Sequence, residues 1–238
     1  MKLLTYDNAK TTKGEKFGYM TFILYLAPNT LNDYGVNLCP MATKGCIFAC
    51  LNTAGFGGIY PKVQEARVNK ANYYVNDRKN FLNDLYYDIK ESLVIAERNG
   101  LIPVYRLNGT SDIQWENIKV LDNKNIFEVF PDLTFYDYTK IANRFDKNLP
   151  TNYHLTFSYS QEEDYYKGKV DEISINLLKK DKSISVIFGG KLPKTFLGFD
   201  VVDGDKSDLR FNENGVVVGL KAKGKARKET SGFVVRNY

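Results

Sequence analysis

The three cysteines of this sequence, Cys39, Cys46 and Cys50, lie within one stretch of twelve residues. Six residues separate the first from the second, three separate the second from the third, and the 238-residue chain contains no other cysteine. Thiolates are preferred ligands of zinc and of iron–sulfur centres. Thiols at spacings that a single loop can fold around therefore predict one metal centre.

This cluster has three interpretations. Three thiolates can bind three irons of a 4Fe-4S iron–sulfur cluster, whose fourth iron is then open to a small molecule. Alternatively, a zinc ion takes the three thiolates and a fourth ligand, either a carboxylate or His154, the only histidine. In the third interpretation the cysteines are small buried hydrophobic residues without a metal. His154 lies inside a predicted strand, where packing or hydrogen bonding is its commoner role.

The composition is that of a globular protein with a sizeable core: 43% of the residues are hydrophobic and 26% are charged. We find no run of 18 apolar residues and no apolar stretch of signal-peptide length at the N-terminus. We therefore expect no membrane span and no secretory signal, and hence a cytoplasmic protein. In that reducing compartment, clustered cysteines bind metal or react rather than form disulfides.

Apolar runs and helical stretches alternate along the chain. The first predicted strand, 19–27, leads directly into the cysteine loop. Pro61 opens a helix over 62–76, and Asp77 caps a second helix over 78–98, which Asn99 and Gly100 end. Residues 113–122 are weakly helical, and a further helix lies near 162–179. The other predicted strands are 101–107, 133–138, 153–158, 183–188, 196–202 and 215–220.

This alternation predicts parallel βα units. We expect an α/β fold in a single domain over 1–238, a partial or irregular β/α barrel with a β-rich C-terminal end. Its parts are a loose N-terminal segment over 1–18, βα units over 19–190 and a β-rich, basic C-terminal part over 191–238. No feature of the sequence specifies an oligomeric state.

Polar residues follow the predicted strands where the strands end. The carboxyl ends of parallel strands meet on one face, so these residues belong beside the cysteine loop. Asp112, Asp137 and Lys140 are the candidate acid–base or substrate-orienting groups among them. The other interpretation of each is a helix cap or a surface ion pair.

Much of the net charge of +5 comes from a run near the C-terminus. Five basic residues occur within eight positions there: Lys221, Lys223, Lys225, Arg227 and Lys228. Such a run is typical either of a surface that binds the phosphates of a nucleotide or nucleic acid or of a solvated tail.

The cysteine loop resembles a segment of the phage gene product 88 family. The resemblance rests on CPMATKGCIFACLNTAGFGG (39–58), with its Cys-Pro start, two further cysteines and a run to glycine. It continues in Tyr60-Pro61, the helical stretch 62–98, YRLNGTSD (105–112), FYDYTK (135–140) and LKAKGKARKETSGFVV (220–235). Most of the chain is covered. The resemblance implies a bacteriophage protein in the cytoplasm of the host cell.

More distantly, a strand that leads into a three-cysteine loop is similar to the radical S-adenosylmethionine enzymes. These hold a four-iron cluster on a Cys-x3-Cys-x2-Cys loop, whereas the spacing here is x6 and x3. The similarity implies S-adenosylmethionine as a cofactor. By position, it also implies cofactor contacts from Gly57, Gly58, Ser111 and Ser158.

Two functions of different classes follow. The first is a phage-encoded iron–sulfur enzyme, related to radical S-adenosylmethionine chemistry, that acts on a nucleotide or nucleic acid. The second is a non-catalytic nucleic-acid- or ligand-binding protein with a structural cysteine loop, either zinc-bound or metal-free. A transglycosylase with Asp112 or Asp137 as nucleophile ranks below both. The sequence has no G-x-S-x-G, P-loop or Rossmann glycine motif, so it does not support those hydrolase and nucleotide-binding classes.

Overall fold

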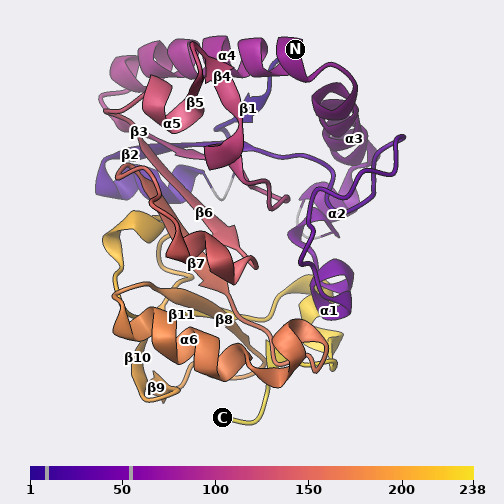
Figure 1. The fold of residues 1–238 in the computed structure, drawn as a ribbon, viewed down its shortest axis with the longest axis vertical. Coiled ribbons are helices and arrows are strands. Elements are labelled where there is room, and N and C mark those ends of the chain that lie inside the picture. The colour runs from indigo at the N-terminus through magenta and orange to yellow at the C-terminus, as the bar shows by residue number, and fades with distance from the viewer. Residues whose placement is uncertain (9–10, 54–55) are drawn as a thin grey trace.

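The computed structural model describes residues 1–8, 11–53 and 56–238. Its centre is a ten-stranded, mostly parallel sheet with the strand order β1-β2-β3-β6-β7-β8-β11-β10-β9, and β12 pairs with the end of β8. A separate two-stranded sheet pairs β4 with β5. Figure 1 shows the large sheet running from α4 at the top to α6 at the bottom.

The strands of the large sheet are short. They are β1 (Leu4–Thr5), β2 (Tyr19–Leu24), β3 (Ile102–Arg106), β6 (Thr134–Thr139), β7 (Tyr153–Ser158), β8 (Ile184–Phe188), β9 (Thr195–Phe196), β10 (Phe199–Asp203), β11 (Val217–Lys221) and β12 (Val234–Val235). The small sheet consists of β4 (Lys119–Leu121) and β5 (Lys124–Asn125).

Two long helices and several short ones accompany these strands. The α-helices are α1 (Lys44–Phe48), α2 (Phe56–Ile59), α3 (Pro61–Asn76), α4 (Arg78–Arg98), α5 (Ile126–Val129) and α6 (Val170–Lys179). The 3-10 helices are η1 (Thr12–Phe17), η2 (Leu51–Thr53), η3 (Trp115–Asn117), η4 (Ala142–Asp146), η5 (Tyr165–Gly168), η6 (Arg210–Asn212) and η7 (Gly224–Lys228).

The helices α3 and α4 begin and end where the sequence predicts. Pro61 is the first residue of α3, where its missing N–H costs nothing. Asp77 caps α4, since its side chain accepts a hydrogen bond from the Asn80 N–H at 3.3 Å. The chain then leaves α4 through Gly100, whose φ of +63° is a conformation that favours glycine.

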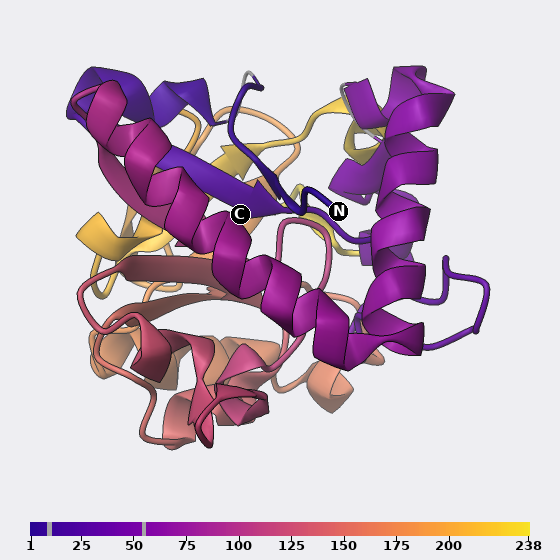
Figure 2. The same ribbon diagram turned by 90° about the horizontal axis from the view of Figure 1, so that it is seen from above.

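The helices α4 and α6 cover the same face of the sheet. Phe22, Tyr105 and Phe135 lie side by side on β2, β3 and β6, and this row packs in one core with the buried stripe of α4. Phe157 and Ile184 continue that face on β7 and β8 and pack with α6. Seen from above, α4 crosses over the sheet and α3 stands to its right (Figure 2).

Six central strands, β2, β3, β6, β7, β8 and β11, are parallel and neighbour one another in their order along the chain. The face that α4 and α6 leave open is covered in part by the segment around η6, where Leu209 packs with Val104 and Tyr136. The carboxyl ends of the six strands share one edge, and the cysteine loop follows the first of them.

The predicted α/β class is confirmed, and the sheet is open. Its strand order ends at β1 and β9, and no closed barrel forms among the described residues. The segment 1–18 is not loose in its described part, because β1 pairs with β2 and the side chains of Leu3 and Leu4 are buried. No described helix has the length and apolar character needed to cross a lipid bilayer.

Three local predictions need correction. Residues 113–122 contain η3 and β4 rather than an α-helix, because burial of Trp115 holds the chain in a tight turn. The predicted strand 196–202 is a hairpin of β9 and β10, which turns where Leu197 and Gly198 have positive φ. The helix predicted near 162–179 begins only at Val170, after the irregular turns of η5.

Candidate metal centre

The loops after β2 and β3 lie against each other, and this contact fixes the base of the cysteine loop. The Gly109 N–H donates to the Leu24 carbonyl oxygen at 3.0 Å, and the Asp112 N–H donates to the Leu38 carbonyl oxygen at 2.9 Å. A Cβ atom at Gly109 would lie 2.7 Å from that Leu24 oxygen, so glycine is required for this approach. Cys39, which follows Leu38, is therefore held beside the loop after β3.

Backbone N–H groups are directed at two of the three thiols. The Asn29 N–H donates to Cys39 Sγ at 3.3 Å, and the Asn52 N–H donates to Cys50 Sγ at 3.5 Å. Cys39 Sγ also lies 3.7 Å from the Thr110 carbonyl oxygen. Because N–H donors stabilise a thiolate more than a thiol, these contacts suit sulfurs that act as ligands.

Cys46 lies in α1, which is held from two sides. Thr43 caps this helix, and its hydroxyl accepts from the Cys46 N–H at 3.2 Å. The Gly45 N–H donates to Glu162 Oε1 at 2.7 Å, which ties α1 to the loop after β7. On its other side Cys46 packs against buried residues of η7 and β12, near the C-terminus.

The three thiols lie close enough to influence one another's ionisation. Burial raises the pKa of Cys39 to about 12 and that of Cys46 to about 11, and it also raises the pKa of Cys50. The charges of Cys50 and Cys46 raise the pKa of Cys39 further, and the charge of Cys50 does the same for Cys46. No disulfide joins any of the three. The role of the three cysteines as ligands of one metal centre stays a prediction.

Two cationic side chains oppose this rise in pKa. Lys140 lowers the pKa of Cys46, and Arg67 lowers the pKa of Cys50. Arg67 comes from α3, and its Nη1 also donates to Asn52 Oδ1 at 2.7 Å. Positive charge beside buried cysteines favours the thiolate form, which is the form that binds metal.

The thiols do not meet at one point. Within residues 1–8, 11–53 and 56–238, no three His, Cys, Asp or Glu side chains converge so as to hold a single metal ion. Zinc–sulfur bonds of about 2.3 Å would require ligand sulfurs within about 4.6 Å of one another. His154, near the amino end of β7, lines a cleft of about 590 Å³ with Lys182 and Glu213. That cleft lies at the opposite end of the strand from the cysteine loop.

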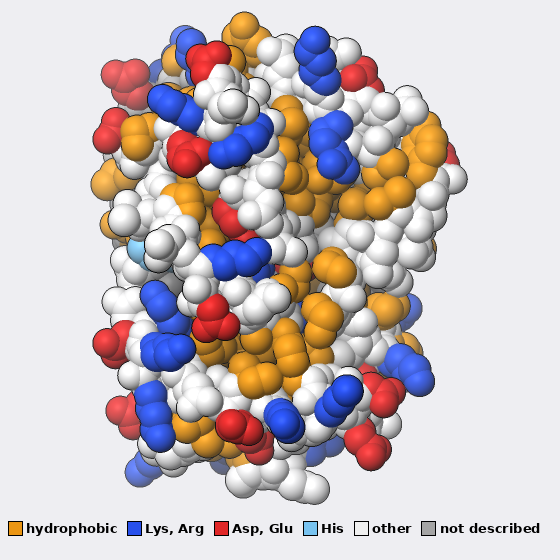
Figure 3. Space-filling model, viewed as in Figure 1, with side chains coloured by type: hydrophobic (Ala, Val, Ile, Leu, Met, Phe, Trp, Pro, Cys, Tyr) orange, Lys and Arg blue, Asp and Glu red, His pale blue; other side chains and the backbone are white. Residues whose placement is uncertain are grey.

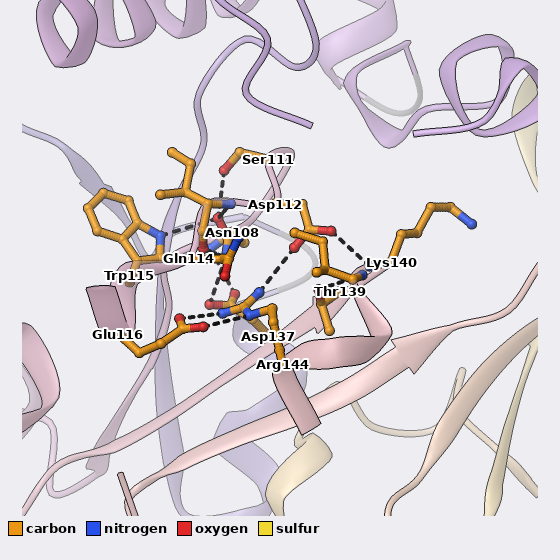
Figure 4. A network of polar contacts seen from close by, with 12 residues as sticks. Asn108, Ser111, Asp112, Gln114, Trp115, Glu116, Asp137, Thr139, Lys140 and Arg144 are labelled. Carbon is orange, nitrogen blue, oxygen red and sulfur yellow. Dashed lines mark hydrogen bonds and ion pairs between the residues drawn. The ribbon is translucent and has the colours of Figure 1, made fainter. Parts of the chain in front are cut away.

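Asn108 organises the loop after β3. Its Oδ1 accepts from the Ser111 hydroxyl at 2.9 Å, the Ile113 N–H at 2.9 Å and the Trp115 indole N–H at 3.2 Å. Figure 4 shows the Ser111 and Trp115 side chains directed at Asn108. The predicted cofactor residue Ser111 is thus already engaged in holding its own loop.

Asp112 faces Arg144, a fully buried arginine of η4. Arg144 Nη1 lies 3.1 Å from Asp112 Oδ1, and its Nε and Nη2 contact the two oxygens of Glu116 at 2.9 and 2.7 Å. The Lys140 N–H donates to the second Asp112 oxygen at 2.8 Å. Burial raises the pKa of Asp112, and Arg144 opposes that rise. Asp112 therefore joins the loops after β3 and β6 (Figure 4).

Asp137 lies on β6 and is fully buried. Its oxygens accept from the Asn108 N–H at 2.7 Å and from the Tyr153 hydroxyl at 3.0 Å. Burial raises its pKa to about 7, although Arg106 and Arg144 lower it. The catalytic role predicted for Asp137 stays a prediction, and its position is that of a group that orients the Asn108 loop.

Lys140 is the predicted acid–base residue that faces the cysteines. Its side chain points away from the Asp112–Arg144 contacts (Figure 4). Its Nζ donates to the Ser158 carbonyl oxygen at 3.3 Å and lies 4.4 Å from the centre of the Tyr165 ring. Burial lowers the pKa of Lys140, while the charges of Cys46 and Glu162 raise it.

The other predicted cofactor residues surround the same edge. Ser158 ends β7, its side chain is half-buried, and its carbonyl group is the one that receives Lys140. Gly57 and Gly58 belong to α2, and Gly58 is exposed. Among the described contacts none joins Ser158 or Gly58 to Ser111, so the role of these residues in binding a cofactor stays a prediction.

The predicted phosphate-binding residues are all exposed, and one has an ionic partner. These residues are Lys221, Lys223, Lys225, Arg227 and Lys228. Lys223 Nζ lies 2.6 Å from Asp205 Oδ1. Within the run, Ala226 is buried and belongs to the small cluster in which Cys46 and Ala49 pack. The basic run therefore borders the cysteine centre.

Three residues of this site are not predicted from the sequence. Arg67 and Arg144 carry no local signal, since each is one charged residue of an ordinary helical stretch. Glu162 lies in the polar run after a predicted strand, so that pattern could have selected it. Burial raises the pKa of Glu162, but hydrogen bonds from Thr43, the Gly45 N–H and other donors outweigh burial and lower it.

Comparison with known proteins agrees with the pattern of the cysteine loop. The model of the family described as gene product 88 matches residues 1–237. The chain belongs to the gene product 88 family. The resemblance predicted from the sequence is thus confirmed, and it makes this gene product 88 protein a member of a bacteriophage family. No curated protein and no solved structure matches the chain.

Proposed function

We propose that this gene product 88 protein is an iron–sulfur enzyme in which Cys39, Cys46 and Cys50 bind three irons of a 4Fe-4S cluster. The observation that carries the proposal is that backbone N–H groups donate to Cys39 Sγ and Cys50 Sγ, while the cations Lys140 and Arg67 act on Cys46 and Cys50. Cations at that place compensate the charge of thiolates, a function that a metal-free cluster of thiols does not need.

The donor set fits a cluster better than a single ion. Thiolates on different irons of a cluster stand further apart than thiolates that share one zinc. Among the described residues no three ligand side chains converge, so a single ion receives no support, while the charges of the thiols act on one another's pKa values. The N–H groups of Asn29 and Asn52 supply hydrogen bonds to sulfur of the kind that tune such clusters.

The fold supports the same proposal. Six sequential parallel strands with the long helices α4 and α6 on one face match the arrangement of an incomplete β/α barrel. We therefore infer a partial barrel whose carboxyl edge carries the reaction site. The cysteine loop, the Asn108 loop and Lys140 all lie at that edge.

We further propose S-adenosylmethionine as the small molecule at the open iron, and a nucleotide or nucleic acid as the substrate. When bound, the cluster would supply an electron to this cofactor. The chain's own residues would bind and orient it. The Ser111 loop, which reaches Cys39 through the Thr110 carbonyl group, would contact the cofactor, while Lys140 balances thiolate charge next to Cys46.

Metal analysis of protein prepared without oxygen tests the cluster. We expect about four irons and four sulfides per chain with a broad visible absorption band. Cys46→Ala should lose the iron, the sulfide and the absorption band. Ile47→Ala, at an exposed neighbouring position of α1, is the matched control and should keep the iron. Wild-type protein supplied with iron and sulfide that retains neither would overturn the proposal.

A separate assay tests the cofactor. Iron-loaded wild-type protein with dithionite as reductant should release methionine from S-adenosylmethionine, and Cys46→Ala should not. An iron-loaded protein that neither binds nor cleaves S-adenosylmethionine would leave the cluster in place and overturn the assignment of this cofactor.

A second candidate function is favoured by the packing of Cys46 and Ala49 against the C-terminal segment. In that case the cysteine loop is structural, with zinc or without metal, in a non-catalytic protein that binds nucleic acid through the basic run. One zinc or no metal, together with salt-dependent binding, would identify it. A transglycosylase receives no such support, since Asp112 and Asp137 are committed to internal contacts.

A further inference from the structure

Exposed hydrophobic side chains are concentrated in the segment of the chain that contains the cysteines. Of the fifteen large hydrophobic residues that are exposed in the described chain, eight lie between residues 31 and 60. We call them the mouth patch: Leu31, Tyr34, Val36, Ile47, Phe48, Leu51, Ile59 and Tyr60. A concentration of hydrophobic side chains on a solvent-exposed surface is typical of a binding site.

The mouth patch extends along one side of the molecule. The loop before α1, then α2, α1 and the C-terminal segment follow one another down the right-hand side of Figure 1. In the same view, the space-filling surface has hydrophobic side chains on both sides of a hollow in its right-hand part (Figure 3). Aromatic rings are available along this side, since Tyr34 is 52% exposed and Phe48 is 49% exposed.

The positive charge beside the mouth patch comes from the C-terminal basic run. Residues 31–62, which span the patch, contain two lysines, Lys44 and Lys62, and one acidic residue, Asp33. The exposed basic run 221–228 adjoins the lower end of the patch, because Ala226 packs in one cluster with Cys46 and Ala49, the neighbour of Phe48. The first acidic residue after that run, Glu229, is buried. The occupant of this surface must therefore combine negative charge with flat apolar groups.

We propose that the mouth patch and the basic run together bind single-stranded nucleic acid, with bases stacked on Tyr34 and Phe48 and phosphates on Lys225, Arg227 and Lys228. The proposal rests on the proposed function, whose substrate class it narrows to an unpaired strand. Exposed aromatic rings beside basic side chains are the usual platform for single strands. In a duplex the bases are paired and stacked inside the helix. The phosphates of a duplex are therefore accessible to the protein, but the faces of its bases are not.

Two other occupants fit the surface less well. A second copy of the chain would bring two basic runs toward each other across a symmetric interface, which their charges oppose. A membrane surface is usually bound by a long amphipathic helix, whereas the patch lies on loops and on helices of four and five residues.

Fluorescence anisotropy with a labelled 20-nucleotide strand and with the matching duplex tests the proposal on the full chain. We expect the single strand to bind at least about 10-fold more tightly than the duplex, and Phe48→Ala to weaken single-strand binding about 10-fold. Tyr87→Ala is the matched control, because Tyr87 is an equally exposed aromatic residue on α4, away from the cysteines. Both residues are exposed, and urea denaturation of each variant checks that it folds.

The basic run is tested by salt dependence. Replacing Arg227 and Lys228 by glutamine should lower the slope of log affinity against log salt by about 1.4, at about 0.7 per phosphate contact on a single strand. The same change at Lys179 and Lys180, exposed at the end of α6, should leave the slope unchanged.

The outcomes separate this inference from the proposed function. Equal binding of strand and duplex, or affinity unchanged in Phe48→Ala, would overturn the inference even in an iron-loaded protein. The inference would also be overturned if the wild-type protein forms a dimer in sedimentation, or binds phosphatidylserine vesicles, and Phe48→Ala abolishes that dimer or that binding. Preferential single-strand binding by wild-type protein that retains no supplied iron or sulfide would support the inference, while the metal result overturns the iron–sulfur proposal.

Discussion

The carboxyl group of Asp137 should make the stability of this protein fall as pH rises from acid to neutral. Asp137 is fully buried on β6, and burial raises its pKa from 3.8 to about 7. Arg106 and Arg144 lower that pKa, and the Asn108 N–H and the Tyr153 hydroxyl also favour the ionised form, but burial dominates. The folded protein therefore holds a proton at pH 5 to 6 that the unfolded chain has released.

The sign and size of the effect follow from this difference. Stability rises with pH where the unfolded state binds more protons, and here the folded state binds more. The free energy of unfolding should therefore decrease by about 4 kcal/mol in total as pH rises from about 4 through 7, at about 1.4 kcal/mol per unit of pKa shift. Between pH 5 and pH 8 the expected decrease is about 2.5 kcal/mol.

Asp137→Asn is the decisive variant. An amide presents the same shape as the protonated carboxyl group, accepting from the Asn108 N–H and donating toward the Tyr153 hydroxyl. The variant should fold and should lose the part of the pH dependence that Asp137 causes. Asp132→Asn, at an exposed position just before β6, is the control that should keep the wild-type dependence.

Urea denaturation at pH 5, 6, 7 and 8 measures the effect. The free energies of unfolding of wild type and Asp132→Asn should fall together with rising pH, while that of Asp137→Asn should fall by about 2.5 kcal/mol less over this range. If Asp137→Asn and wild type show parallel profiles, Asp137 is ionised in the folded protein at pH 5 and the reasoning from its burial is wrong.

Two other substitutions test the contacts that hold the site. Arg144→Met leaves the buried carboxylates of Asp112 and Glu116 without their cation. Arg144→Met should lower the free energy of unfolding by about 3 to 5 kcal/mol in urea denaturation. The control Arg98→Met, at the exposed end of α4, should lower it by less than about 1 kcal/mol. Equal losses in the two variants would contradict the argument from burial. Gly45→Ala would place a Cβ atom 2.6 Å from Phe233 Cβ, so it should destabilise the protein by about 1 to 3 kcal/mol and expose the segment 224–235 to limited proteolysis. An unchanged cleavage rate would show that α1 and this segment are not held together.

Local signals predicted most of the elements around the site. The helices α3 and α4 follow from Pro61, Asp77 and Gly100, because each of these residues acts on its own few neighbours. Most of the central strands lie within the predicted apolar runs. The cysteine spacing alone placed three thiols on one loop after the first parallel strand, and the polar strand ends directed attention to Asp112 and Lys140.

The predicted elements are wrong where the local sequence pattern is weak or fits more than one structure. The predicted strand 196–202 is two strands, because Leu197 and Gly198 form a turn that an apolar run conceals. The segment 1–18 is polar in composition, yet Leu3 and Leu4 find a partner in β2 and a place in the main core. Pairing with a strand that follows more than ten residues later leaves no trace in the segment's own pattern.

The kinds of groups available at the site can be read from the amino-acid sequence: three thiols on one loop, polar residues at strand ends and a basic run near the C-terminus. Which of these groups come into contact depends on how the chain folds in three dimensions. The side-by-side register of six parallel strands brings Lys140 to Cys46 across about ninety residues of chain and buries Asp137 within the sheet. Packing of η7 and β12 against α1 brings the basic run to the cysteines. Such contacts depend on sheet order and on the burial of distant side chains, whereas periodicity and capping act within a few residues of the chain.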